Sequence, residues 1–198
     1  MKKVAIIHHS AIENNDWQFL KIDKIHERRW NWQTKSRLWF YVGYHFVIEK
    51  DWLVKQARLI DEIGAHCNTN IDWIKYKSKV LNPNYDTIGI CLAGNFEKEE
   101  PTQEQLESLL KLLRELRIKR VYWHRDFKQT VCPGVNMYKY LNEVNDLINY
   151  SYKNIYETEK ENCTILRNKK LAEKLASIDN KELYFLFVIL LGRVIKLI

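Results

Sequence analysis

The sequence of 198 residues is long enough for one full-sized domain and a smaller appendage. Hydrophobic residues make up 46% and charged residues 29%, a globular balance that excludes a largely disordered chain. The formal net charge of +7 favours a polyanionic partner, either nucleic acid, anionic lipid headgroups or acidic cell-wall polymers, and charge alone does not choose among them.

The first half of the chain predicts two strands and one helix. The apolar run Val4–Ile7 is typical of a buried strand. Residues 16–29 predict a helix that Asp16 caps, and Val42–Ile48 predicts a second strand, followed by a turn. One apolar face of this helix is expected to consist of Leu20, Ile22 and Ile25.

The second half predicts two further strands, each close to a helix. Residues 64–86 read as a long loop, after which residues 87–93 and 120–123 predict strands. Thr102 and Gln105 match a capping box at the start of a leucine-rich helix. Residues 136–149 predict another helix, whose apolar face is Met137, Leu141, Val144 and Ile148.

This order of elements predicts an α/β fold in which a central β-sheet is flanked by helices. We place a domain boundary near residue 150, because the chain is polar and charged from 151 to 168. The remainder predicts a small helical extension, which is apolar at its end over residues 183–198. Packing of this end on the domain or on a second copy is favoured over binding to an anionic membrane surface.

The cysteine content and the length of the N-terminal apolar run bear on the cellular location. Four cysteines are present in a chain that has enough apolar residues to fold without disulfides, so we expect reduced thiols. The run Val4–Ile7 is much shorter than the roughly 7–15 residues of a signal-peptide core. We therefore expect synthesis in the cytoplasm without a signal peptide.

Three residues that are far apart in sequence form a candidate metal site. His8 follows the first predicted strand, His124 follows the fourth, and Cys132 lies shortly after His124. Two imidazoles and one thiolate can hold zinc by three corners of a tetrahedron and leave the fourth corner for water, as in catalytic rather than structural zinc sites. His26 and His66 stand alone and are more simply structural.

Five segments carry a family resemblance. They are, in order, Ile7-His8-His9-Ser10-Ala11, Gly43-Tyr44-His45-Phe46-Val47-Ile48, Gly64-Ala65-His66, residues 88–96, and His124-Arg125-Asp126 through Thr130-Val131-Cys132-Pro133-Gly134. Residues 1–150 thereby resemble the zinc-dependent N-acetylmuramoyl-L-alanine amidases of the amidase-2 family, which includes phage lysins and animal peptidoglycan recognition proteins. The set of segments is highly specific, although no single one is decisive.

The resemblance implies a role for each matching residue. His8, His124 and Cys132 match the zinc ligands, Tyr44 matches the catalytic tyrosine, and Thr130 stands where members carry Lys or Thr. Tyr44 and Thr130 are then the candidates for oxyanion donor and proton handler, with their division of roles open. Trp52 departs from the family, which has Asp-Gly where this chain has Asp51-Trp52, and it is expected to alter the turn and to line the cleft.

The function implied is hydrolysis of the amide bond between N-acetylmuramic acid and L-alanine in peptidoglycan, with a phage endolysin as the best fit. The alternative is a non-catalytic peptidoglycan-binding module, which the retention of all three ligands disfavours. A nucleic-acid binder, the third interpretation, is disfavoured because no recognition motif accompanies the positive charge.

Overall fold

The computed structural model describes residues 2–13, 17–29, 35–67, 82–140 and 142–149, all of which belong to one compact unit, Met1–Ser151. The predicted helical extension at residues 151–198 lies outside this part and stays a prediction. The strands are β1 Val4–His9, β2 Phe46–Ile48, β3 Val54–Gln56, β4 Thr87–Leu92 and β5 Arg120–Trp123. The helices are α1 Phe19–Arg29, α2 Pro83–Asp86, α3 Gln103–Glu115, the 3₁₀ helix η3 His124–Asp126 and α4 Val135–Tyr138.

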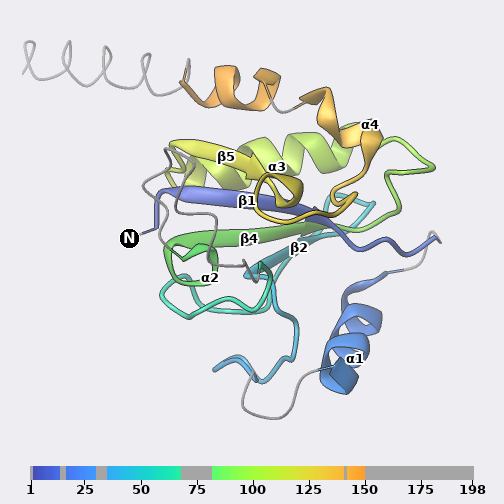
Figure 1. Ribbon diagram of the computed structural model, residues 1–198, viewed down its shortest axis with the longest axis vertical. Coiled ribbons are helices and arrows are strands. Elements are labelled where there is room, and N and C mark those ends of the chain that lie inside the picture. Colours follow the sequence, from blue (N-terminus) through green and yellow to red (C-terminus); the bar gives the residue numbers. More distant parts are fainter. Residues whose placement is uncertain (1, 14–16, 30–34, 68–81, 141, 150–198) are drawn as a thin grey trace, which may run out of the picture. The chain divides into compact units, whose positions relative to one another are not determined.

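The five strands form one mixed sheet in the order β3-β2-β4-β1-β5, which confirms the predicted fold class. β1 lies between β4 and β5 and is parallel to both, as Figure 1 shows. Five of its six residues are buried, as expected for an apolar run with a neighbour on each side. β1 and β5 are therefore adjacent, which is the arrangement needed to bring His8 and His124 together.

Two strand predictions needed correction. The regular strand β2 covers only Phe46–Ile48 instead of Val42–Ile48, and β3, an antiparallel edge strand, was not predicted. The sequence Val54-Lys55-Gln56 is short and half polar, so it carries little strand signal of its own. Pairing with β2 is what makes it a strand.

The helix α1 begins at Phe19 rather than at residue 16, and Asp16 lies outside the described residues. Its first amides are capped by a distant carboxylate, because the backbone N–H groups of Gln18 and Phe19 donate to Glu49 over 2.9 and 2.8 Å. The predicted apolar face was partly wrong. Leu20 is 67% exposed and Ile25 39% exposed, whereas the buried residues are Phe19, Ile22 and His26.

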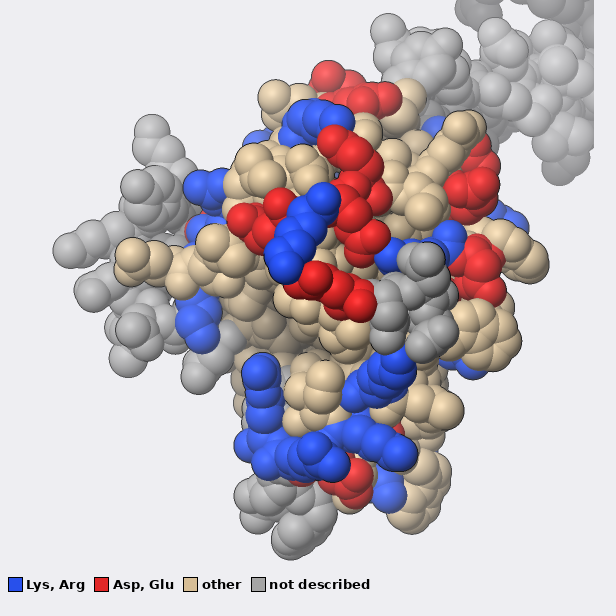
Figure 2. Space-filling model, turned by 90° about the vertical axis from the view of Figure 1, so that its right-hand side faces the viewer, with Lys and Arg blue, Asp and Glu red and all other residues tan. Residues whose placement is uncertain are grey.

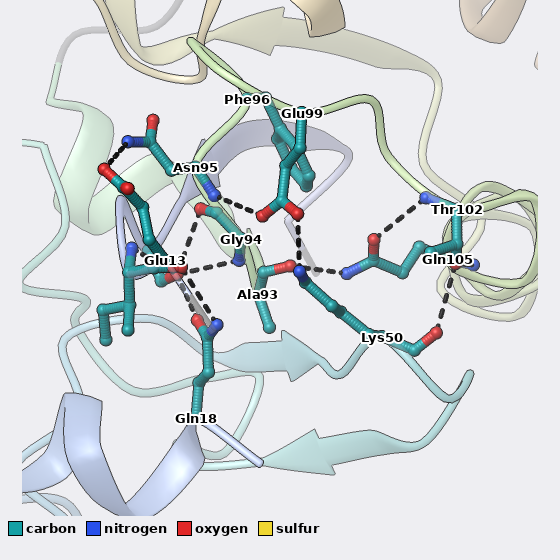
Figure 3. Close-up of polar contacts among 12 residues, drawn as sticks. Glu13, Gln18, Lys50, Ala93, Gly94, Asn95, Phe96, Glu99, Thr102 and Gln105 are labelled. Carbon is teal, nitrogen blue, oxygen red and sulfur yellow. Dashed lines mark hydrogen bonds and ion pairs between the residues drawn. The ribbon is translucent and has the colours of Figure 1, made fainter. Parts of the chain in front are cut away.

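The capping box at the start of α3 is confirmed, and it extends into the sheet (Figure 3). The Thr102 side chain accepts from the backbone N–H of Gln105 over 3.1 Å. The buried Gln105 amide also donates to the carbonyl of Ala93, just beyond β4, over 2.8 Å. An ion pair of 2.6 Å between Lys50 and Glu99 crosses the same region. These contacts tie the helix start to the carboxyl ends of β2 and β4.

The helix predicted over residues 136–149 is interrupted. α4 ends at Tyr138, Lys139 forms a turn, and residues 140 and 142–149 are helical again. Met137, Val144 and Ile148 of the predicted face are buried, while Leu141 lies outside the described residues. None of the described helices has the length and apolar character needed to cross a membrane.

The surplus of positive charge is unevenly distributed over the surface. On the face drawn in Figure 2, Lys and Arg side chains gather in the lower part, and Asp and Glu gather above them. α1 contributes Lys21, Lys24, Arg28 and Arg29 to the positive charge of the unit. One part of this face is thus suited to contact with a polyanion.

Candidate metal centre and cleft

The three predicted ligand residues meet at the edge of the sheet. His8 lies in β1 itself, opposite Cys91 of β4, because β1 extends two residues beyond its predicted end. His124 follows β5 directly and opens η3. One nitrogen of each ring and the Cys132 sulfur all lie within 4.8 Å of one another. The cluster could therefore hold a metal ion by three protein ligands.

The segment that carries Cys132 is folded back onto His124. The Arg125 N–H donates to the Cys132 carbonyl over 3.1 Å, and the Thr130 hydroxyl accepts from the Cys132 N–H over 3.2 Å. Gly134 has a φ of +100°, and a Cβ there would lie 2.4 Å from the Phe96 carbonyl carbon. Only glycine fits this position, which fixes the path of the chain just after the cysteine.

Burial determines the protonation of the three candidate ligands. It lowers the pKa of His8 well below its usual value, and together with Lys128 it lowers that of His124 to about 4. Both rings are neutral at pH 7 and offer a lone pair. Burial also raises the pKa of the Cys132 thiol to about 12, and the hydrogen bond from the His9 N–H opposes this rise. A bound cation would stabilise the thiolate form.

The environment of His124 fits a bound metal. Its Nε2 atom is buried and has no hydrogen-bond partner among the described residues. A buried nitrogen without a partner is costly, and coordination of a cation would satisfy it. Two imidazole nitrogens and one sulfur are the donor types that zinc prefers, whereas magnesium and calcium prefer oxygen.

The ring of His9 does not belong to the metal-ligand cluster, although His9 directly follows His8 in the sequence. Its Nδ1 atom accepts the backbone N–H of Phe96 over 3.2 Å, and its own backbone N–H faces the Cys132 sulfur. The ring of His9 is thus hydrogen-bonded to the loop after β4. This agrees with the choice of His8 over His9 as the candidate ligand.

A cleft of about 330 Å³ adjoins the cluster. Its lining residues are His26, Arg29, Tyr44, Ala65, His66, His124 and Lys128. Arg29 and Lys128 place two positive charges along it, and no carboxylate occurs among these lining residues. The cleft is therefore suited to a substrate that carries negative charge.

Tyr44 lies in this cleft beside the candidate ligands. Its ring centroid is 5.0 Å from that of His8. Burial, and after it the Cys91 sulfur, raise the pKa of the Tyr44 hydroxyl well above its usual value, so the group is protonated at neutral pH. In this structure the hydroxyl forms a hydrogen bond with the side chain of Cys91 in β4. Thr130, the other predicted catalytic residue, is not among the residues lining this cleft, and its hydroxyl contacts the backbone of Cys132 instead.

Trp52 is not among the lining residues either, and its side chain is 65% exposed. Its φ of +71° lies in the left-handed region, so the turn keeps a glycine-type backbone conformation despite the tryptophan. The expectation that Trp52 alters the turn relative to the family stays a prediction.

Two histidines were interpreted as structural, yet both line the cleft. His26 accepts the Gly43 N–H over 3.0 Å, which is a structural contact, and its ring is also 5.5 Å from that of Tyr44. His66 contacts His8 directly, with 3.0 Å between His66 Nδ1 and His8 Nε2. The matching segment Gly64-Ala65-His66 was the available signal for His66. The three described cysteines, Cys67, Cys91 and Cys132, are free thiols, and the expectation of a reduced thiol at Cys163 falls outside the described residues.

Comparison with known proteins identifies relatives of the same kind. A family model described as N-acetylmuramoyl-L-alanine amidase matches residues 2–135. The endolysin of Klebsiella phage KP32 is 29% identical over 130 residues, which cover 61% of this chain and 75% of the endolysin. The solved structure of N-acetylmuramoyl-L-alanine amidase LysC from Clostridium intestinale has a TM-score of 0.56 and 31% identity, covering 75% of this chain and 85% of that one. Peptidoglycan recognition protein 1 of Bos taurus is 29% identical over 119 residues, or 57% of this chain and 56% of that protein.

Proposed function

The chain belongs to the N-acetylmuramoyl-L-alanine amidase family, and on that premise we propose that it is a zinc-dependent peptidoglycan hydrolase. It cleaves the amide bond between N-acetylmuramic acid and the L-alanine of the stem peptide. The observation that carries the proposal is the cluster of His8, His124 and Cys132, whose ligand atoms lie within 4.8 Å of one another in a chain of this family. Tyr44 lies next to the cluster in the same cleft.

His8, His124 and Cys132 would hold the zinc ion. When bound, zinc lowers the pKa of a water molecule toward neutrality and polarises a carbonyl group. Tyr44 contributes a hydroxyl that stays protonated, so it can donate to the oxygen on which negative charge develops during attack on the amide. The Thr130 hydroxyl oxygen accepts the Cys132 N–H and keeps its own O–H to donate, so Tyr44 and Thr130 are both candidates for oxyanion donor and proton handler.

The charges of the cleft are compatible with a stem peptide. Arg29 ends α1 and Lys128 follows η3, so the two cations come from separate segments and both line the cleft. A stem peptide carries carboxylates that these cations can bind. The endolysin relatives support the cell wall as the place of action.

A receptor without activity is the alternative within the same family, since peptidoglycan recognition protein 1 is among the relatives. The complete set of ligand-type residues favours the enzyme. For the apolar end of the chain, residues 183–198, we propose packing on the domain or on a second copy, with contact to an anionic membrane as the alternative.

Digestion of purified peptidoglycan tests the proposal. We expect mass spectrometry to detect free stem peptides with an L-alanine amino terminus. A chelator should abolish their release, and added zinc should restore it, while magnesium should not. New reducing sugar ends without free peptides would identify a glycosidase and overturn the proposal.

A further inference from the structure

His66 and His8 are in direct contact although they are 58 positions apart in sequence. The Nδ1 atom of His66 is 3.0 Å from the Nε2 atom of His8, and their rings meet edge to face with centroids 5.1 Å apart. Both side chains are buried. Two buried rings at this distance share one proton between the facing nitrogens, because two protonated rings would repel and two lone pairs could not form a hydrogen bond.

Two glycines form the cavity that holds the His66 ring. A Cβ on Gly64 would lie 2.4 Å from the ring carbon Cδ2, and a Cβ on Gly89 would lie 2.5 Å from the same atom. Gly89 is in β4 and Gly64 is in the loop before His66, so the ring is held between the sheet and its own loop. Any side chain at either glycine would displace the ring from His8.

The backbone of His66 is fixed as well. Its N–H group donates to the Asn84 side-chain oxygen over 2.9 Å, and the same oxygen accepts the N–H of Cys67 over 2.9 Å. Asn84 belongs to α2, directly before β4. The ring is therefore held against β4 and the backbone against α2.

The direction of the shared hydrogen bond follows from which nitrogen of His8 faces the cluster. His8 Nδ1 lies 3.8 Å from the Cys132 sulfur, so Nδ1 is the atom that can bind a metal and must keep its lone pair free. A neutral His8 then carries its proton on Nε2 and donates it to His66 Nδ1. A neutral His66 in turn carries its proton on its own Nε2, a buried atom without a hydrogen-bond partner among the described residues. A metal-binding histidine is usually oriented in this way by a carboxylate, a carbonyl or water. In this chain the acceptor is a second imidazole.

We propose that His66 is a positioning residue that holds His8 in the Nε2–H tautomer, with Nδ1 directed at the metal. The inference rests on the proposed function only in taking the cluster as the zinc site. It assigns a role to the Gly64-Ala65-His66 segment and to Gly89, since these residues place the acceptor nitrogen.

A matched pair of variants tests the inference through zinc affinity rather than activity. In His66→Asn the side-chain oxygen occupies the place of Nδ1 and keeps an acceptor, whereas His66→Leu has a similar shape and no acceptor. Competition with a chromogenic zinc chelator should show roughly 10–100-fold weaker zinc binding in His66→Leu. His66→Asn should retain most of the wild-type affinity. Equal losses in the two variants, or none in His66→Leu, would overturn the inference.

A measurement on the metal-free wild-type protein tests the inference without the variants, in case His66→Leu does not fold. Nitrogen-15 NMR of histidine-labelled protein reports which ring nitrogen of His8 carries the proton. We expect the proton on Nε2, and a proton on Nδ1 would refute the assignment. These outcomes are distinct from a failure of the proposed function, which would appear as a wild-type protein that binds no zinc.

Discussion

The backbone N–H of His9 donates to the sulfur of Cys132 over 3.4 Å, across 123 positions of sequence. This contact orients the sulfur toward His8 and favours its thiolate form. Burial acts in the opposite direction and raises the pKa of the Cys132 thiol to about 12. The sulfur is thus held in place by the fold, while its ionisation depends on a bound cation.

Replacement of Cys132 by serine should abolish zinc binding and hydrolysis while keeping the fold. A neutral hydroxyl is a poor zinc ligand, so the loss of affinity should exceed the roughly 10–100-fold that follows loss of a supporting contact. Chelator competition measures the affinity, and circular dichroism the fold. Cys67→Ser makes the same change at a buried sulfur outside the cluster and should retain zinc. Wild-type zinc affinity in Cys132→Ser would exclude the cysteine as a ligand.

Removal of the Tyr44 hydroxyl should slow turnover without loss of zinc. If the hydroxyl donates to the developing oxyanion or handles a proton, Tyr44→Phe should lower kcat by about 10²–10⁴-fold. The zinc affinity should not change, since the ring that packs beside His8 remains. Tyr85→Phe, at a tyrosine that is 56% exposed, is the matched control. Full activity of Tyr44→Phe would show that the hydroxyl is dispensable.

Acid should destabilise the fold through buried neutral histidines, of which His45 is the clearest. Burial and then Lys2 lower its pKa to about 3. Its Nδ1 accepts the Gly89 N–H over 3.0 Å, which requires the neutral ring. Above about pH 6.5 neither the folded nor the unfolded state binds this proton. As the pH falls from about 6.5 to 3, only the unfolded state binds it, so stability decreases.

The pH effect can be measured by chemical denaturation at several pH values. His45 contributes a limiting slope of about 1.4 kcal/mol per pH unit to the dependence of the free energy of unfolding on pH. His45→Asn keeps an acceptor for Gly89 but does not titrate, so its stability should fall less steeply with acid. Identical slopes for the two proteins would rule out His45 as a source of the acid sensitivity.

Replacement of Trp52 by glycine should relieve backbone strain in the turn and thereby stabilise the folded state. The φ of +71° costs a residue with a side chain about 1–2 kcal/mol, and glycine adopts it without that cost. The greater entropy of glycine in the unfolded chain offsets about 0.4–1 kcal/mol. Trp52→Gly should therefore be more stable than Trp52→Ala, which removes the exposed ring but keeps the strain. Denaturant unfolding compares the two, and equal stability would refute the assignment of strain.

The C-terminal end can be tested by deleting the residues after Asn180. If residues 183–198 pack on the domain or on a second copy, the truncated protein should be less stable or change its oligomeric state. Thermal unfolding and light scattering measure these properties. A truncated protein with unchanged stability, unchanged assembly and full activity on purified peptidoglycan, but without binding to anionic vesicles, would instead support a membrane contact.

Local patterns in the sequence were sufficient for several elements. β5 has its predicted bounds, and the Thr102–Gln105 capping box forms as expected. These features depend on residues within a few positions of one another, and the apolar runs of β1 and β4 indicate burial directly. The candidate ligands could also be named in advance, because each one stands beside a strand or within a matching segment.

Other features depend on contacts between distant parts of the chain. Glu49 caps α1 from the end of β2, and β3 is a strand only through its pairing with β2. His66 looked structural because the sequence does not show that its ring faces His8 between two glycines. The sequence by itself determined which residues are candidates for the chemistry and which short segments are regular. Only the tertiary structure decided their partners, because hydrogen bonds and burial depend on distances in space that spacing along the chain does not encode.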